Sequence, residues 1–80
     1  MLTNVLVVDD EEIICTLFAA MLGHYGRYHV VTTTDGHQVM DILRREPFDV
    51  MLLDMSMPAI SGLEVLRQVT QAFEELPVII

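Results

Sequence analysis

Hydrophobic residues follow two different periods along this chain, one typical of buried strands and one typical of helices. Residues 5–8 form a continuous apolar run that is rich in β-branched side chains, which predicts a strand buried on both faces. Apolar residues then recur at helical spacing over residues 11–24, where Gly23 and Gly26 supply stop signals. The residues of this predicted helix that are expected to face the core are Ile14, Leu17, Phe18, Met21 and Leu22.

The middle of the chain repeats the alternation of strand and helix. Residues 28–34 are β-branched but more polar, which predicts a strand at the edge of the sheet. A turn at Asp35-Gly36 leads into a second helix, predicted over residues 37–45 and closed by Pro47. Residues 49–53 predict another fully buried strand. The residues of the second helix that are expected to face inward are Val39, Ile42 and Leu43.

The last third of the chain contains a loop, a helix and the start of a strand. Residues 55–61 form the loop, and Ser61 with Glu64 has the spacing of a capping box for a third helix. Residues 77–80 begin a fourth strand. Strands that alternate with helices in this way predict one α/β domain, in which a parallel sheet is covered by helices on both faces. The expected inner face of the third helix consists of Leu63, Leu66, Val69 and Phe73.

Composition and charge narrow the classes of partner. The net charge is −8, and the four basic residues form no patch longer than a pair, so nucleic acid and anionic membranes are poor partners. No apolar stretch approaches the ~18–20 residues that cross a bilayer. The single cysteine, Cys15, is expected to be a small buried residue, and this usage fits a reducing cytoplasm.

Carboxylates follow two of the predicted buried strands directly. Asp9 and Asp10 end the first strand, and Asp54 ends the third. Parallel strands end at one edge of their sheet, so an outer position for the polar second strand makes the first and third strands neighbours, about 5 Å apart. Such a switch point is where open α/β sheets bind ligands. The sequence therefore predicts that the three carboxylates meet in one crevice.

Three carboxylates in one crevice repel one another, which raises at least one pKa and opposes folding unless a cation is bound. An all-oxygen ligand set favours Mg²⁺ or Ca²⁺ over zinc, and an incomplete carboxylate set favours Mg²⁺. Asp9 and Asp10 would then hold the ion, and Asp54 is the candidate nucleophile toward a phosphoryl group. The alternative for Asp10 is a helix cap, and Glu11 and Glu12 are expected to complement the helix dipole or remain solvated.

Three segments, "VLVVDDEE", "LLDMSMPAISG" and "LPVII", resemble the receiver domain of bacterial two-component response regulators. The resemblance lies in a hydrophobic strand that ends in an acid pair and in the motif D-x-x-M-P-x-x-x-G. It covers essentially the whole chain, and the segment "TDGHQVMDIL" agrees with it. The motif residues in this chain are Asp54, Met57, Pro58 and Gly62.

The resemblance implies a flavodoxin-like, doubly wound sheet with strand order 2-1-3-4. It implies that Asp54 accepts a phosphoryl group from a sensor histidine kinase or a phosphotransfer protein. Asp9, Asp10 and the backbone carbonyl of Ser56 would organise Mg²⁺, and Met57, Pro58 and Gly62 would shape the loop. The implied protein is a cytoplasmic signalling module and not an enzyme with its own external substrate, and it acts through a homodimer or an output domain.

The chain also departs from the family pattern. Family members carry a Ser or Thr at the end of the fourth strand and a Lys at the end of the fifth, and this sequence contains no lysine. We therefore expect residues 1–80 to be a receiver domain that is incomplete at its C-terminus, with the fifth strand and the last helices missing.

Other functions remain open at this point. One is a phosphorylation-independent pseudo-receiver that only binds partners. Another is a Mg²⁺-dependent phosphohydrolase with an Asp nucleophile, although a dehalogenase-like enzyme would carry a second Asp where this chain has Ser56. A flavin carrier would need a phosphate-binding loop after the first strand, where four acids stand. His24, His29 and His37 are weaker candidates for a phosphodonor or metal ligand, because none is predicted at the carboxyl end of a strand.

Overall fold

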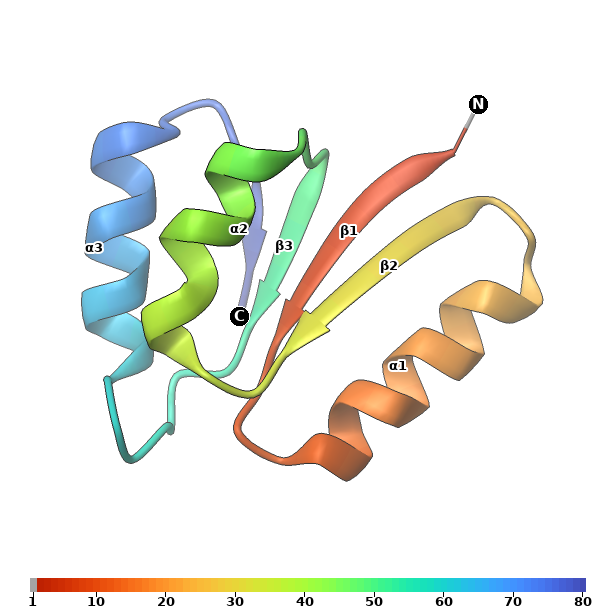
Figure 1. Cartoon of the computed structure of the whole chain (residues 1–80), viewed down its shortest axis with the longest axis horizontal. Helices are drawn as coiled ribbons and strands as arrows, with labels where there is room; N and C mark the ends of the chain where they lie inside the picture. The colour runs from red at the N-terminus through yellow and green to blue at the C-terminus, as the bar shows by residue number, and fades with distance from the viewer. Residues whose placement is uncertain (1) are drawn as a thin grey trace.

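The computed structural model describes residues 2–80, which form a four-stranded sheet with helices on both faces (Figure 1). Its elements in chain order are β1 (Thr3–Val8), α1 (Glu12–His24), β2 (Tyr28–Thr33), the 3-10 helix η1 (Gly36–Gln38), α2 (Val39–Arg45), β3 (Val50–Leu53), α3 (Gly62–Ala72) and β4 (Val78–Ile79). The strands lie in the order β2-β1-β3-β4, and every neighbouring pair is parallel. The predicted order and the edge position of the polar second strand are therefore confirmed.

The larger part of the core lies between the sheet and the pair α2 and α3. Alternate residues of the two central strands, Leu6 and Val8 on β1 and Met51 and Leu53 on β3, point to this side and are buried. This is the period of two that a strand dictates. The three residues of α2 that were predicted to face inward are buried here, as are two residues of α3; they are Val39, Ile42, Leu43, Val65 and Val69.

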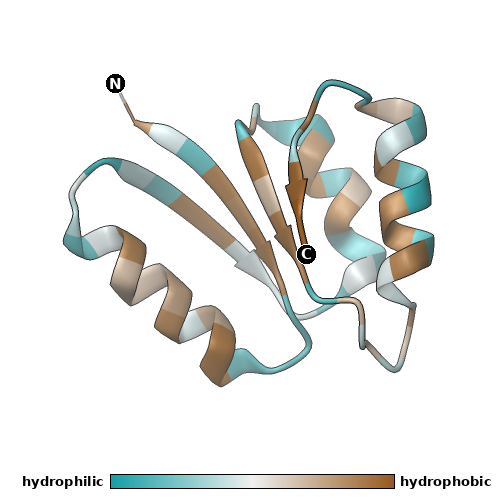
Figure 2. Ribbon diagram, turned by 180° about the vertical axis from the view of Figure 1, so that it is seen from behind, coloured by the Kyte–Doolittle hydropathy of each residue, from teal (hydrophilic) through white to brown (hydrophobic). Residues whose placement is uncertain are grey.

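Helix α1 covers the opposite face and packs mainly against β2 and β1 (Figure 1). Cys15 is buried against Val5 and Val7, as the sequence predicted. The predicted inner face of this helix is wrong in part: Ile14 and Leu22 are half-buried, whereas Leu17, Phe18 and Met21 are exposed. Hydrophobic residues occur along much of α1 (Figure 2), so their spacing does not define one face. Cys15 is the buried residue of the helix, so the face that meets the sheet is the one that carries Cys15.

Two further expectations about burial need correction. On β3, Met51 and Leu53 are buried but Val50 and Leu52 are only half-buried. The strand β3 is thus not fully buried on both faces. On the face of Val50 and Leu52, α1 is the covering helix within residues 2–80, and it packs mainly against β2 and β1.

The inner face of α3 is also shifted from the prediction. Val65 and Val69 are fully buried, Leu66 and Phe73 are half-buried, and Leu63 is 66% exposed. Leu63 stands two positions before Val65, and two positions are about 200° apart around an α-helix, so Leu63 lies on the side opposite the buried Val65. The predicted inner face was therefore right for Val69 and wrong for Leu63.

Local polar contacts set the ends of the helices. Ser61 caps α3 as predicted, since its Oγ accepts a hydrogen bond of 3.2 Å from the Glu64 amide. The Glu64 carboxylate instead pairs with Arg67, at 2.6 Å, so only half of the predicted capping box forms. The second helix begins with the 3-10 turn η1, one residue before the predicted start. Among the described helices, none combines the length and the apolar character that crossing a membrane requires.

Candidate functional site

Backbone pairing extends past the ends of β1 and β3 and fixes the residues that follow them. Val8 lies opposite Leu53 in the parallel ladder. The amide of Asp54, the residue that follows β3, donates to the Val8 carbonyl at 2.9 Å. The amide of Asp9, which follows β1, donates to the Thr33 carbonyl at 3.2 Å. Asp9 and Asp54 therefore leave the same edge of the sheet with their backbones still held by it.

The three predicted site carboxylates meet at this edge. One oxygen each from Asp9, Asp10 and Asp54 lies within 4.8 Å of the others. Among residues 2–80, no other group of three or more Asp, Glu, His or Cys side chains lies close enough together to share an ion. The predicted convergence is confirmed, because neighbouring parallel strands carry their carboxyl ends to one place.

Two of these carboxylates are oriented by backbone amides two residues further along. Oδ1 of Asp9 accepts a hydrogen bond of 3.0 Å from the Glu11 amide, and Oδ1 of Asp54 accepts one of 3.0 Å from the Ser56 amide. Both side chains are half-buried. In each residue, the hydrogen bond to Oδ1 restricts rotation of the carboxylate, and the second oxygen can face a ligand.

The surroundings of Asp10 change the acidity of its carboxyl group. Partial desolvation, hydrogen bonding to Asp54 and the negative charges of Asp54 and Asp9 together raise the pKa of Asp10. The predicted upward shift of at least one carboxyl is confirmed in direction. A cation between the three groups would reverse the electrostatic part of this shift.

The donor set fits a hard divalent cation. All three side chains offer oxygen, and no nitrogen or sulfur ligand belongs to the group. Ligand oxygens at about 2.0–2.1 Å from Mg²⁺ are about 2.9 Å apart in adjacent positions and about 4.2 Å apart in opposite ones. Oxygens within 4.8 Å of one another would therefore move closer together around the ion or reach it through a bridging water. Asp9, Asp10 and Asp54 can therefore hold Mg²⁺ and leave coordination positions free.

The loop after Asp54 folds back onto the end of β3. Met57 is buried in the core beside α2 and α3, whereas Pro58 and Ser56 are exposed. The Gly62 amide donates to the Met55 carbonyl at 3.2 Å. A Cβ on Gly62 would overlap the Met55 backbone and lie 2.5 Å from the Asp54 carbonyl oxygen, so this close approach requires glycine.

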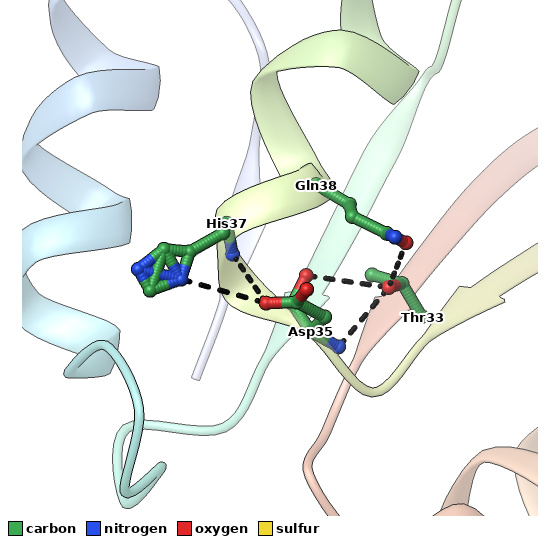
Figure 3. Close-up of polar contacts among 4 residues, drawn as sticks. All are labelled: Thr33, Asp35, His37 and Gln38. Atoms are coloured by element: carbon green, nitrogen blue, oxygen red, sulfur yellow. Dashed lines mark hydrogen bonds and ion pairs between the residues drawn. The ribbon is translucent and has the colours of Figure 1, made fainter.

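The turn between β2 and α2 carries a polar cluster that the sequence reasoning did not single out (Figure 3). The buried Thr33 Oγ1 accepts a hydrogen bond of 3.1 Å from the Asp35 amide and lies 3.3 Å from Gln38 Oε1. Oδ1 of Asp35 in turn accepts a hydrogen bond of 2.9 Å from the His37 amide. The run "TTTDG" contains the turn chemistry, but its neighbours in space cannot be read from it.

The three histidines lie outside the carboxylate group. His37 Nδ1 is 3.5 Å from Asp35 Oδ1, and His29 Nε2 is 3.4 Å from Glu46 Oε1. The ring of His24 packs edge-on against Tyr25. These contacts explain the surface positions of the histidines without a metal.

Comparison with known proteins agrees with this geometry. The family described as "Response regulator receiver domain" matches residues 5–80. The response regulator RR06 of Streptococcus pneumoniae serotype 2 is 43% identical over 77 residues, which are 96% of this chain and 35% of RR06. The chain thus spans about a third of that relative.

Solved structures show the same fold. The response regulator TrrA of Thermotoga maritima, in complex with Mg²⁺-BeF, superimposes with a TM-score of 0.88 at 31% identity, over 96% of this chain and 66% of that one. TrrA in complex with the histidine kinase ThkA gives a TM-score of 0.87 at 31% identity, with the same coverage. The family match, the parallel sheet and the acidic edge agree, and the chain belongs to the response regulator receiver domain family.

Proposed function

We propose that this receiver domain is the phosphoacceptor module of a two-component phosphorelay and that Asp54 takes the phosphoryl group. Asp9, Asp10 and Asp54 would hold Mg²⁺ together with the backbone carbonyl of Ser56. The observation that carries the proposal is the meeting of three carboxylates within 4.8 Å at the ends of neighbouring strands. The likeness to TrrA, which has been solved with Mg²⁺-BeF and with a histidine kinase, supports both the metal and the donor.

The contacts of Asp54 define its part in the transfer. Its amide is bonded to Val8 and its Oδ1 to the Ser56 amide, so the second carboxylate oxygen is the candidate nucleophile. That oxygen forms a bond to the phosphorus of a phosphohistidine as the bond from phosphorus to the histidine nitrogen breaks, which leaves an acyl phosphate on Asp54. Bound Mg²⁺ would supply positive charge to the oxygens of the transferring group.

The neighbouring residues complete the site. Asp9 and Asp10 keep the region negative until a cation binds, which makes transfer dependent on the ion. Met57, buried in the core, and Gly62, at the start of α3, anchor the loop that follows Asp54, and Pro58 lies on its exposed part.

The wider setting is proposed on the same basis. The phosphodonor would be a sensor histidine kinase or a phosphotransfer protein, and the receiving partner a second copy of the chain or an output domain. The module would work in the cytoplasm and would have no external substrate of its own. The net charge of −8 argues against nucleic acid as a direct partner of these residues.

Intact-mass spectrometry with a small-molecule phosphodonor tests the proposal. In a receiver domain of full family length, these residues should gain one phosphoryl group with acetyl phosphate and Mg²⁺, and none when EDTA removes the metal, whereas residues 1–80 alone should be labelled weakly or not at all. Asp54→Asn should remain unlabelled, because an amide cannot form the acyl phosphate. Asp41→Asn is the matched control, since Asp41 is an exposed acid of α2 that pairs with Arg44, and it should be labelled like the unaltered chain.

Two results would contradict the assignment. Equal labelling of the unaltered chain and of Asp54→Asn would remove Asp54 from the role. Absence of labelling in the domain of full family length, with the fold verified by circular dichroism, would favour a pseudo-receiver that binds partners without phosphorylation.

A further inference from the structure

Gly36, the first residue of η1, gives space to the loop that follows Asp54. Gly36 is buried, and a Cβ at this position would lie 2.5 Å from Ile60 Cγ2, 3.1 Å from Val65 Cγ2 and 3.4 Å from Met57 Cε. Ile60 and Met57 belong to the loop between β3 and α3. This loop can therefore take its position because Gly36, in the turn before α2, has no side chain.

The same turn is bonded to the segment that carries Asp9. The Thr33 carbonyl accepts the Asp9 amide at 3.2 Å, and Cys15 Sγ lies 3.8 Å from that carbonyl. The Thr33 hydroxyl fixes the turn from within, by accepting the Asp35 amide and lying beside Gln38 (Figure 3). Residues 33–38, named here the 33–38 corner, thus touch both segments that bear the carboxylates.

We infer that the 33–38 corner is a positioning element of the cation site, which holds the end of β1 and the loop after β3 at the spacing where Asp9 and Asp54 share one ion. This inference rests on the proposed function, because it assumes that the carboxylates bind Mg²⁺. Thr33 and Gly36 contribute no ligand and act through the backbone of Asp9 and the packing of Ile60 and Met57. Mg²⁺ requires near-ideal octahedral geometry, so a small displacement of one segment weakens binding.

Titration of the ¹⁵N-labelled chain with MgCl₂, followed by NMR at the Ser56 amide, tests the inference. The substitution Gly36→Ala pushes Ile60 and its loop outward, and we expect it to weaken Mg²⁺ binding by about tenfold, as the loss of supporting contacts does at metal sites. Gly23→Ala is the matched control, because no atom lies within 4 Å of a Cβ built there. It should bind Mg²⁺ as the unaltered chain does.

A double variant separates positioning from general loss of stability. Ile60→Ala removes the methyl group that the new Cβ meets, so Gly36→Ala with Ile60→Ala should recover most of the Mg²⁺ affinity. The same double variant loses apolar packing, so its free energy of unfolding should not recover. Recovery of affinity without recovery of stability is the expected result, and the absence of any recovery in affinity would overturn the inference.

Thr33→Val keeps the test decisive if Gly36→Ala does not fold. Valine preserves the size of the side chain but removes the acceptor of the Asp35 amide, and Mg²⁺ binding should weaken in the same direction. Equal affinity of the folded corner variants and the unaltered chain would overturn the inference and leave the proposed function intact. Failure of the unaltered chain to bind Mg²⁺ would overturn both.

Discussion

At the scale of residues, the three acids of the site differ in how the chain holds them. Asp9 and Asp54 each accept a hydrogen bond of 3.0 Å from a backbone amide, which restricts the rotation of their carboxylates. The pKa of Asp10 is instead raised, by partial desolvation first and then by its two acidic neighbours. The charge of Asp10 therefore opposes the folded state when no cation is bound.

The substitution Asp10→Asn should raise the urea midpoint at pH 7 in EDTA. The native pKa of Asp10 lies above its unfolded value, so the ionised carboxylate lowers the free energy of unfolding at neutral pH. This loss is recovered as the pH falls through the native pKa, so the difference between variant and unaltered chain should narrow in acid. With saturating Mg²⁺ the order should reverse, because the variant lacks a ligand.

Urea titrations at several pH values, with and without Mg²⁺, measure this effect. Asp41→Asn removes an equal charge from an exposed position and should not raise the midpoint, since Asp41 has a basic partner in Arg44. A lower midpoint for Asp10→Asn in EDTA would show that repulsion at the site does not oppose folding.

At the scale of elements, the apolar pattern predicted correctly which segments become helices. It predicted less well which side of each helix is buried. In α3 the buried residues are Val65 and Val69, while Leu63 is exposed. In α1, apolar residues occur on several sides, and contact with β2 selects the side that carries Cys15. A hollow of about 450 Å³, lined in part by Phe18, remains between α1 and the far strands.

A pair of substitutions in α3 tests the observed face. Val65→Ala should lower the free energy of unfolding by about 2 kcal/mol, because Val65 is fully buried and its lost methyl groups leave a cavity. Leu63→Ala, near the start of the same helix, should change it by less than about 0.5 kcal/mol, because its side chain is 66% exposed. Urea denaturation gives both values. A larger loss of stability in Leu63→Ala than in Val65→Ala would contradict the observed burial and would favour the inner face predicted from the sequence.

At the scale of the whole molecule, an excess of negative charge is combined with one site that can neutralise part of it. The chain carries a net charge of −8, and three of its acids face one another at the edge of the sheet. Self-repulsion of this kind destabilises a compact state, and a small domain has little stability in reserve. Binding of a divalent cation should therefore be visible in the stability of the entire fold.

Mg²⁺ at ten times its dissociation constant should stabilise the chain by about 1.4 kcal/mol, which corresponds to a rise of several degrees in the melting temperature. Differential scanning calorimetry measures the shift. NaCl at matched ionic strength is the control for general screening and should produce a smaller rise. The variant Asp9→Asn should lose the excess over NaCl, and an equal rise in the two salts would argue against a specific site.

Much of the fold and the centre of the site could be predicted from the sequence. The order of strands and helices follows from periods of 2 and 3.6 residues, which are properties of the local chain. The meeting of Asp9, Asp10 and Asp54 follows from the parallel arrangement, because Asp9 and Asp54 each come directly after a strand of the same direction and Asp10 follows Asp9. The burial of Cys15 and the cap at Ser61 were likewise predictable from local pattern.

Only the tertiary structure decided which side of α1 and α3 meets the sheet and how the loops around the site support one another. The contact of Gly36 with Ile60 joins two loops that are separated in sequence by a whole helix and strand. Nothing in either loop specifies the other, because that contact depends on how α2, α3 and the sheet pack together. Sequence alone thus determined which carboxylates meet at the edge of the sheet, and packing between distant segments determined how the loops around them are arranged.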